Sequence, residues 1–267
     1  MFTIIDLIQP DNLDEAYQIL SDKRNNTILG GCAFLKMGKK RINTGIDLTN
    51  LKLNYIQESD DFIEIGAMTS LRELETHPLL KEYYKGVLPQ SVRDIIGVQF
   101  RNGVTVGASV YSKYGFSDLI TALLCLDTEV ELFKAGRMPL ADFLTMPKAK
   151  DILVRLWLKK TLRQATYLSF RSSASDYSVL NVAVSKLDNH WTIAVGARPS
   201  KAAIAVSASA MLSQEVPTLE KIEEIEQKVS EELSFGTNQR GSATYRKALC
   251  KTLVKRGIME VLPCKSN

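Results

Sequence analysis

Histidine and clustered cysteine are scarce in this sequence, and their scarcity excludes several kinds of reactive site. The chain has two histidines, His77 and His190, too few for a histidine-rich metal site, and both are expected to be ordinary surface residues. Its four cysteines lie far apart and form no C-x-x-C, so neither a zinc ribbon nor a ferredoxin-type cluster can assemble locally. Free thiols in a reducing cytoplasm are the simplest interpretation.

Long apolar runs and common nucleotide-binding motifs are also missing. No stretch approaches the ~20 apolar residues that span a bilayer, and residues 1–6 carry no basic start, so neither a membrane span nor a signal peptide is expected. The absence of G-x-G-x-x-G, Walker and G-x-S-x-G motifs disfavours a Rossmann site and a hydrolase elbow. The net charge of +4 is scattered, and Lys39-Lys40-Arg41 is expected to be a solvated turn, so no nucleic-acid surface is predicted.

The hydrophobic pattern divides the chain into two parts. Residues 1–165 alternate short strands with helices, which predicts strands at 27–29, 62–66 and 129–133, and helices from residue 10, from residue 70 and over 119–126. A different rhythm follows, with alternating apolar runs at 152–158, 167–170, 179–184 and 191–195, and helical stretches at 200–213, 218–233 and 241–257. We therefore predict one domain over 1–150 and an α+β domain over 151–267, whose small antiparallel sheet packs on helices.

A first glycine-containing segment follows the predicted strand at 27–29. Gly30-Gly31 leads into the small and apolar residues Cys32, Ala33 and Phe34. Glycine lets a backbone turn sharply and approach a ligand closely, and successive exposed N–H groups after such a turn form an anion-binding concavity. A diphosphate is a natural guest for it, although a purely structural turn explains the same residues.

A second segment of small residues runs from Arg101 to Val110 and carries hydroxyl groups at Thr105 and Ser109. Ser117-Asp118 then opens an apolar helix. Asp118 has two interpretations. It complements the dipole at the helix start, or its carboxylate accepts hydrogen bonds from a ribose or ribityl chain.

Together these segments resemble the FAD-binding family of xanthine dehydrogenases, aldehyde oxidases and bacterial carbon monoxide dehydrogenases. The motifs that carry the resemblance occur in the family's order: Leu29-Gly30-Gly31-Cys32-Ala33-Phe34-Leu35, Ile65-Gly66-Ala67-Met68-Thr69, Arg101-Asn102-Gly103-Val104-Thr105-Val106-Gly107-Ala108-Ser109, Asp118-Leu119, Phe170-Arg171, Leu180-Asn181-Val182-Ala183, Val195-Gly196-Ala197-Arg198-Pro199 and Arg240-Gly241-Ser242-Ala243-Thr244-Tyr245-Arg246. They span nearly the whole chain. The resemblance implies a two-lobed FAD-binding domain of the vanillyl-alcohol-oxidase/PCMH type, followed by the C-terminal domain of the carbon monoxide dehydrogenase flavoprotein type.

The resemblance also implies which residues contact FAD. The backbone of Ile28, Leu29, Gly30, Gly31, Cys32, Ala33 and Phe34 would surround the diphosphate. Thr105, Gly107, Ala108 and Ser109 would line the phosphate and ribityl side, and Asp118 would hold a sugar hydroxyl. Ile152 and Leu153 would pack near the adenine or flavin, and Arg171 would lie near the ring. No catalytic side chain and no metal ligand is expected on this chain.

By the same resemblance, the chain is the electron-transfer subunit of a molybdenum hydroxylase, an oxidoreductase complex of the xanthine dehydrogenase type. A large partner subunit would carry the molybdenum cofactor and a small one two [2Fe–2S] clusters. The FAD subunit would pass their electrons to NAD⁺ or another acceptor, since FAD is stable with one or two electrons. The hydroxylated substrate would bind on another chain.

Two alternatives stay open, and departures from the family pattern support the first of them. The family's T-x-G-G-N is Thr105-Val106-Gly107-Ala108-Ser109 here, and the run 111–116 contains Tyr111 and Tyr114 in place of small residues and proline. These tyrosines either stack near the flavin or pack in a core. One alternative is a flavin-free assembly module, and the other is a stand-alone flavin reductase, against which the R-G-S-x-x-Y-R ending argues.

Overall fold

A computed structural model describes residues 1–214 and 216–262, and its contacts group them into two compact units. The first unit comprises Met1–Leu74, Gly97–Ser112 and Thr128–Lys159. The second comprises Glu75–Ile96, Lys113–Asp127 and the described residues from Lys160 onward. Both units draw on separated stretches of the chain. The predicted division after residue 150 is a statement about sequence domains and stays a prediction.

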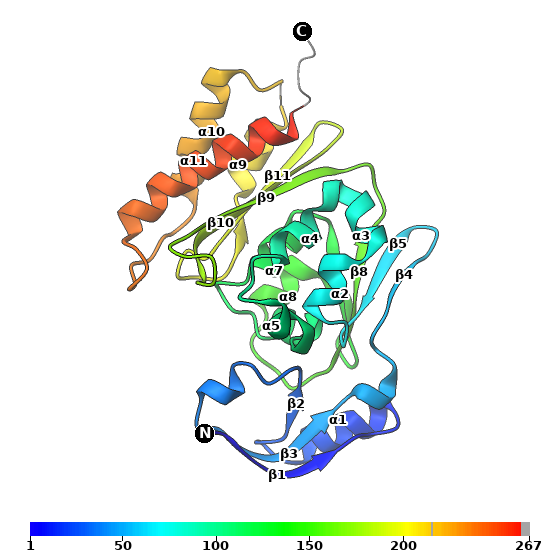
Figure 1. Ribbon diagram of the computed structural model, residues 1–267. Helices are drawn as coiled ribbons and strands as arrows, with labels where there is room; N and C mark the ends of the chain where they lie inside the picture. Colours follow the sequence, from blue (N-terminus) through cyan, green and yellow to red (C-terminus); the bar gives the residue numbers. More distant parts are fainter. Residues whose placement is uncertain (215, 263–267) are drawn as a thin grey trace. The chain divides into compact units, whose positions relative to one another are not determined.

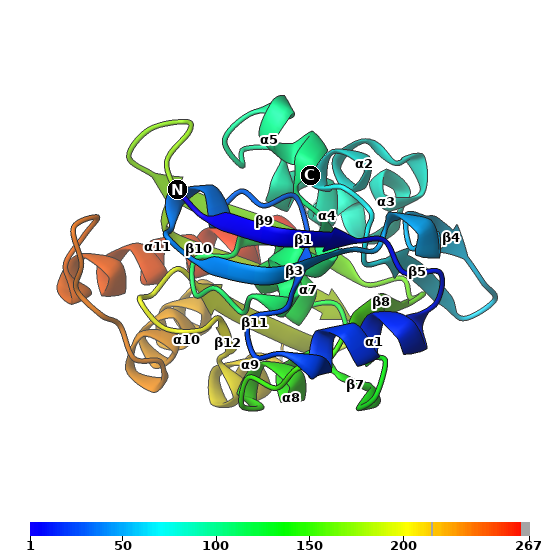
Figure 2. The same ribbon diagram turned by 90° about the horizontal axis from the view of Figure 1, so that it is seen from below.

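The first unit contains two sheets. A parallel sheet has the order β1-β3-β2 and comprises β1 (Thr3–Ile8), β2 (Thr27–Leu29) and β3 (Arg41–Asp47). Figure 2 shows β1 and β3 side by side. An antiparallel sheet has the order β4-β5-β8-β6-β7 and comprises β4 (Ile56–Glu58), β5 (Phe62–Gly66), β6 (Thr128–Leu132), β7 (Gly136–Pro139) and β8 (Leu153–Lys159).

Short helices connect these strands. They are α1 (Leu13–Asp22), α5 (Val98–Gly103), α6 (Val106–Tyr111) and α8 (Leu140–Thr145), with the 3-10 turns η1 (Leu35–Met37) and η2 (Thr49–Leu51), and α2 (Leu71–Thr76) begins in this unit. Helix α1 shows why they form where they do. The Asn12 side chain accepts a hydrogen bond from the Glu15 N–H, which caps the helix, and Ala16 and Leu20, four residues apart, bury one face in the core.

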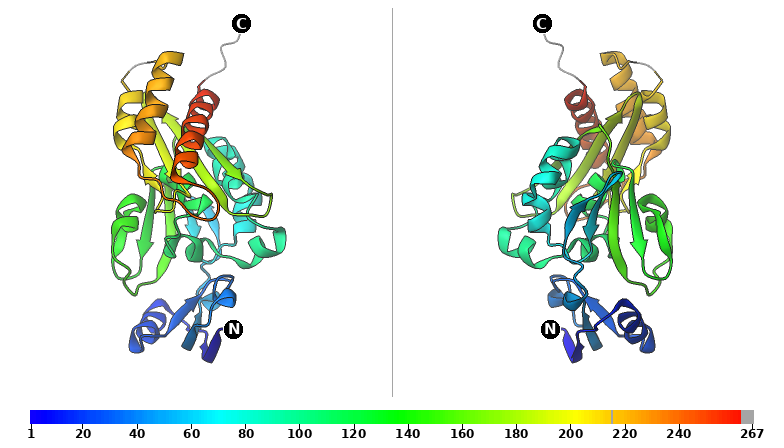
Figure 3. Two further views of the ribbon diagram at one scale, coloured as in Figure 1. Left: turned by 90° about the vertical axis from the view of Figure 1, so that its left-hand side faces the viewer. Right: turned by 90° about the vertical axis from the view of Figure 1, so that its right-hand side faces the viewer.

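The second unit is built on an antiparallel sheet of order β12-β11-β10-β9. Its strands are β9 (Gln164–Arg171), β10 (Ser178–Leu187), β11 (His190–Gly196) and β12 (Ala203–Ile204). Its helices are α3 (Pro78–Glu82), α4 (Val87–Val92), α7 (Asp118–Leu124), α9 (Val206–Leu212), α10 (Leu219–Glu232) and α11 (Ala243–Val261), with the 3-10 turn η3 (Tyr83–Gly86). Helices α9, α10 and α11 cover one face of this sheet and share a core with it (Figures 1 and 3).

Two expectations about these elements are wrong. The run at 152–158 forms β8, but it pairs with β5 and β6 in the first unit rather than with the strands that follow it. The helix expected over 200–213 begins only at Val206, because residues 203–204 pair with β11 as an edge strand. Among the described residues, no helix combines the length and apolar character needed to cross a bilayer.

The guanidinium of Arg246, in α11, fixes the loop that precedes this helix. Arg246 is 1% exposed, and it donates hydrogen bonds to the carbonyl oxygens of Val179, Gly236 and Gly241 and to the Asn238 side chain. These hydrogen bonds use four of the five N–H groups of the buried guanidinium, whereas a shorter ammonium cannot reach all four acceptors. The final arginine of the R-G-S-x-x-Y-R motif therefore joins the loop at 236–241 to strand β10.

We expect Arg246→Lys to lower the free energy of unfolding by about 2–4 kcal/mol, because the lost hydrogen bonds leave buried carbonyl groups unpaired. Urea unfolding followed by circular dichroism measures the change. The control is Lys247→Gln, which alters an exposed neighbour in the same helix. Equal stabilities of the two variants would contradict this role of Arg246.

Candidate functional site

The two glycine-containing segments predicted from sequence pack directly against each other in the first unit. We call residues 30–34 the first bend and residues 103–109 the second bend. A Cβ atom added at Gly30 would lie 2.4 Å from the Ala108 Cβ, and one at Gly31 would lie 1.9 Å from the Gly103 carbonyl oxygen. Gly31 also has a φ of 85°. Side chains at these two positions would force the bends apart.

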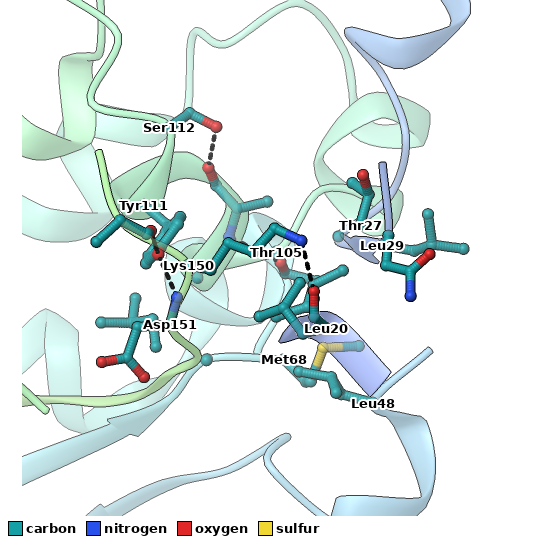
Figure 4. Close-up of a pocket in the computed structure, with 18 of the residues that line it drawn as sticks. Leu20, Thr27, Leu29, Leu48, Met68, Thr105, Tyr111, Ser112, Lys150 and Asp151 are labelled. Atoms are coloured by element: carbon teal, nitrogen blue, oxygen red, sulfur yellow. Dashed lines mark hydrogen bonds between the residues drawn. The ribbon is translucent and has the colours of Figure 1, made fainter. Parts of the chain in front are cut away.

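A cavity of about 380 Å³ opens beside the two bends (Figure 4). It falls within the size range of small-ligand pockets. All of its lining residues belong to the first unit: Leu20, Arg24, Asn26, Thr27, Ile28, Leu29, Gly30, Lys40, Leu48, Ala67, Met68, Thr105, Gly107, Ala108, Tyr111, Ser112, Ala149, Lys150, Asp151 and Leu153.

The main-chain N–H groups of the second bend are already used inside the protein. Those of residues 106–109 donate to the carbonyl oxygens of Ala67, Thr69 and Thr105 and to the Thr105 side chain, at 2.8–3.2 Å. The Ser109 hydroxyl likewise donates to the Thr105 carbonyl oxygen at 3.0 Å. This return bond to the carbonyl four residues earlier is common for serine in a helix. The second bend therefore supplies shape to the cavity but few free donors.

The first bend has the opposite character. Within the described part of the chain, the N–H groups of Gly31, Cys32 and Ala33 donate no hydrogen bond. Gly31 and Cys32 both have left-handed backbone, with φ values of 85° and 56°. Successive free N–H groups at such a turn attract an anion. The donors expected from sequence are thus concentrated in one of the two bends.

One wall of the cavity is the segment 149–151, which is fixed from two sides. The Tyr111 hydroxyl donates to the Ala149 carbonyl oxygen at 2.6 Å and accepts from the Asp151 N–H at 2.9 Å. The Lys150 ammonium donates to the Leu20 carbonyl oxygen at 2.7 Å, as Figure 4 shows. Burial raises the pKa of Tyr111, so its hydroxyl stays protonated and able to donate.

A separate polar cluster centres on Asp118 in the second unit. Its Oδ1 accepts hydrogen bonds from the Tyr167 hydroxyl, from Ser178 at 2.6 Å and from Asn181 at 2.9 Å. Its Oδ2 accepts from the Arg171 guanidinium at 2.8 Å. The side chains of Asp118 and Arg171 are 6% and 10% exposed, so this is a buried ion pair with additional hydrogen bonds.

The electrostatics of this cluster follow from burial and from the Asp118 carboxylate. Burial alone lowers the pKa of Arg171, but the adjacent Asp118 charge raises it, and the net shift is upward. Burial and Asp118 together raise the pKa of Tyr167 well above its usual value. Tyr167 and Arg171 therefore both remain protonated donors to Asp118 at neutral pH.

The predicted contact residues fall into three groups in the structure. Those that line the cavity are Ile28, Leu29, Gly30, Thr105, Gly107, Ala108 and Leu153. Those in the first unit that do not line it are Gly31, Cys32, Ala33, Phe34, Ser109 and Ile152, of which Ile152 is wholly buried in the core. Asp118 and Arg171 belong to the second unit and are paired with each other.

Sequence reasoning missed several residues of the cavity. Arg24, Lys40 and Lys150 line it, and Lys40 is also exposed, as expected for a solvated turn, whereas Arg41 beside it begins β3. Tyr111, for which flavin stacking and core packing were both open, is half-buried at the cavity wall. No local pattern distinguishes these side chains from ordinary surface residues, because the cavity combines segments far apart in the chain.

Comparisons with known proteins agree with the motif order. Residues 2–158 match the model of the FAD binding domain in molybdopterin dehydrogenase, and residues 165–261 match that of the CO dehydrogenase flavoprotein C-terminal domain. The nicotine 6-hydroxylase medium subunit of Paenarthrobacter nicotinovorans is 26% identical, covering 94% of this chain and 95% of its own. The glyceraldehyde dehydrogenase medium chain of Sulfolobus acidocaldarius is 24% identical, covering 95% and 97%.

Solved structures show the same fold. A chain of carbon monoxide dehydrogenase from Hydrogenophaga pseudoflava superimposes with a TM-score of 0.89 at 21% identity, over 97% of both chains. A chain of quinoline 2-oxidoreductase from Pseudomonas putida 86 gives a TM-score of 0.87 at 20% identity, over 98% of both chains. The predicted α+β fold, with a small antiparallel sheet packed on helices, is confirmed.

The Asp118 cluster yields a stability prediction. We expect Asp118→Asn to lower the free energy of unfolding by about 3–5 kcal/mol, because it leaves the buried Arg171 charge unpaired. Adding Arg171→Met should recover part of this loss, as the double variant buries no charge. Urea unfolding measures both changes, and Asp188→Asn in an exposed turn is the matched control. An Asp118→Asn variant as stable as this control would contradict the importance of the ion pair.

Cys32 gives a prediction about pH and cofactor binding. Burial raises the pKa of the Cys32 thiol despite the opposing effect of Lys36, so little thiolate exists at neutral pH. Iodoacetamide should modify Cys32 slowly at pH 7, with a rate that still rises above pH 9, and added FAD should slow it further. Peptide mass analysis measures the rate, with the buried Cys125 and Cys250 as unreactive internal references. Rapid modification at pH 7, unaffected by FAD, would contradict both the raised pKa of the thiol and its protection by bound FAD.

Proposed function

Because this chain belongs to the family of FAD-binding medium subunits of molybdenum hydroxylases, we propose that it connects iron–sulfur clusters on a small partner subunit to a final electron acceptor. A large partner subunit would carry the molybdenum cofactor. Bound FAD supplies the capacity to accept electrons singly or in pairs. The names of its relatives support this division of labour, since a medium subunit or chain implies a larger and a smaller companion.

The finer proposal is a complex of the xanthine dehydrogenase type, with NAD⁺ as a candidate acceptor. Its support is the order of motifs along the sequence, from Gly30-Gly31 to Arg240-Gly241-Ser242. The relatives are named for nicotine and glyceraldehyde, so family membership alone does not define the hydroxylated substrate. A cytoplasmic location stays part of the proposal. Among the described residues, Cys32, Cys125 and Cys250 are free thiols, as expected in a reducing compartment.

The residues of the first unit fit the phosphate-bearing half of FAD. Within the described part of the chain, the N–H groups of Gly31, Cys32 and Ala33 donate no hydrogen bond, and they suit a diphosphate. The cavity beside Gly30 offers apolar contacts from Leu20, Leu48, Met68 and Leu153, as an adenine would require. The chain's own part would be to bind and orient the cofactor and to exclude water from it.

One observation carries this proposal. Two segments about 70 residues apart, each predicted to contact phosphate, pack against each other, and one cavity is lined by Gly30 of the first and by Thr105, Gly107 and Ala108 of the second. The Asp118 carboxylate fits less simply as a binder of sugar hydroxyls, because four protein donors already use its oxygens. Its contact with FAD stays a prediction, as does that of Arg171.

Two measurements test the function against its alternatives. The visible spectrum of the purified chain should show an oxidised-flavin band, whereas a colourless protein that binds no added FAD would indicate the flavin-free module. Co-purification of the chain from its natural source should bring larger molybdenum-containing and smaller iron–sulfur-containing chains. A flavin-containing chain that purifies alone and reduces a substrate unaided would instead indicate the stand-alone reductase.

The close approach of the bends gives a matched pair of variants. We expect Gly31→Ala to weaken FAD binding at least tenfold, because its φ of 85° and the Gly103 carbonyl oxygen both oppose a side chain. Gly103→Ala, whose added Cβ would meet no atom within 4 Å, should keep normal affinity. Flavin fluorescence titration measures both constants. Equal affinities would show that contact between the bends does not govern FAD binding.

A further inference from the structure

The cavity carries more positive charge than its family motifs explain. Three cationic side chains line it, Arg24, Lys40 and Lys150, against a single carboxylate, Asp151. All three cations lie outside the family motifs at the two bends. A cavity lined by one sign of charge concentrates ligands of the opposite sign.

None of these cations is neutralised within the described part of the chain. Arg24 forms no hydrogen bond or ion pair there, and the Lys40 ammonium donates only to the Thr27 hydroxyl, at 2.9 Å. The Lys150 ammonium donates to carbonyl oxygens at the end of α1 and meets no carboxylate. The positive charge of the cavity is therefore available to a ligand.

The single carboxylate, Asp151, offsets only one of the three positive charges. Its two oxygens accept hydrogen bonds from the N–H groups of Lys134, Ala135 and Ile152, at 2.7–3.0 Å. Asp151 thus fixes the loop that follows β6 and its own neighbour. Over residues 1–214 and 216–262, no ion pair joins it to Arg24, Lys40 or Lys150.

The first bend and the cations border the same cavity, since Gly30 lines it together with Arg24 and Lys40. A sphere of 380 Å³ is about 9 Å across, comparable with the ~8 Å over which physiological salt screens charges. The second bend, by contrast, offers almost no free N–H groups, and its Ser109 hydroxyl is turned back to Thr105. Attraction for an anion must come from the first bend and from side chains.

We propose that Arg24 and Lys40 attract the diphosphate of FAD and set a salt-dependent part of its affinity, an inference that rests on the proposed function. In this chain, side-chain charge supplements the main-chain donors of the first bend. Both residues are positioning residues for the cofactor and take no part in electron transfer. Lys150 is left out of the test, because its removal would also release the wall at 149–151.

The test compares Arg24→Gln and Lys40→Gln with Lys23→Gln and Lys39→Gln in the full chain freed of flavin. All four residues are exposed, and each control removes the same charge from a sequence neighbour that does not line the cavity. FAD is titrated by fluorescence at several KCl concentrations. Each cavity variant should bind FAD about threefold to tenfold more weakly at low salt, with a shallower dependence on salt. The controls should match the unmodified chain, and the charge-conserving Arg24→Lys and Lys40→Arg should restore both affinity and salt dependence.

The outcomes separate this inference from the proposed function. If the unmodified chain binds FAD with no dependence on salt, or if cavity and control variants weaken equally, the charge proposal is overturned while the flavoprotein function stands. If the charge-conserving variants fail to restore binding, Arg24 and Lys40 act through packing and the proposal is again overturned. If the unmodified chain binds no FAD at all, both fail together.

Discussion

The contact between the two bends is the constraint on which the site depends. Gly30 and Gly31 approach the segment 103–108 so closely that any side chain at either glycine would overlap it. The start of α6 is fixed from another side, because the N–H groups of Val106 and Gly107 donate to carbonyl oxygens of the loop that follows β5. A parallel sheet and an antiparallel sheet are thereby joined through backbone contacts, and the cavity is the space that remains beside the junction.

The second unit is held by a different principle, the satisfaction of buried charge. Asp118 collects four donors, and Arg246 has four acceptors. A buried charge is tolerated when its hydrogen-bonding capacity is filled, and it then ties together segments distant in sequence. Here the two charges connect α7 with β9 and β10, and α11 with β10. Asp118 and Arg246 therefore stabilise the second unit through contacts within the protein, which need no ligand.

The sequence predicted the strands β2 and β5 and the two glycine-containing bends, because turns and periodicity are local properties, but it did not predict β1 or β3. It placed β8 in the wrong sheet, since alternating apolar residues indicate a strand without naming its partner. It expected Ser109 to offer a donor, but in a helix the hydroxyl binds the carbonyl of Thr105 instead. The sequence did not single out Arg24 and Lys40, because the residues next to a basic side chain in the sequence do not reveal whether it borders a cavity.

These contacts show what changes when Ala108 and Ser109 stand in place of the family's glycine and asparagine. A family asparagine has a second amide arm, and Ser109 has one hydroxyl, which is already used within the helix. A chain that offers fewer fixed dipoles can still attract a diphosphate through mobile charged side chains, but salt screens this attraction more readily than it screens buried amides. In this chain the second bend offers few free donors while cationic side chains line the same cavity, so a diphosphate bound there would depend on charge more than on directional hydrogen bonds from the second bend.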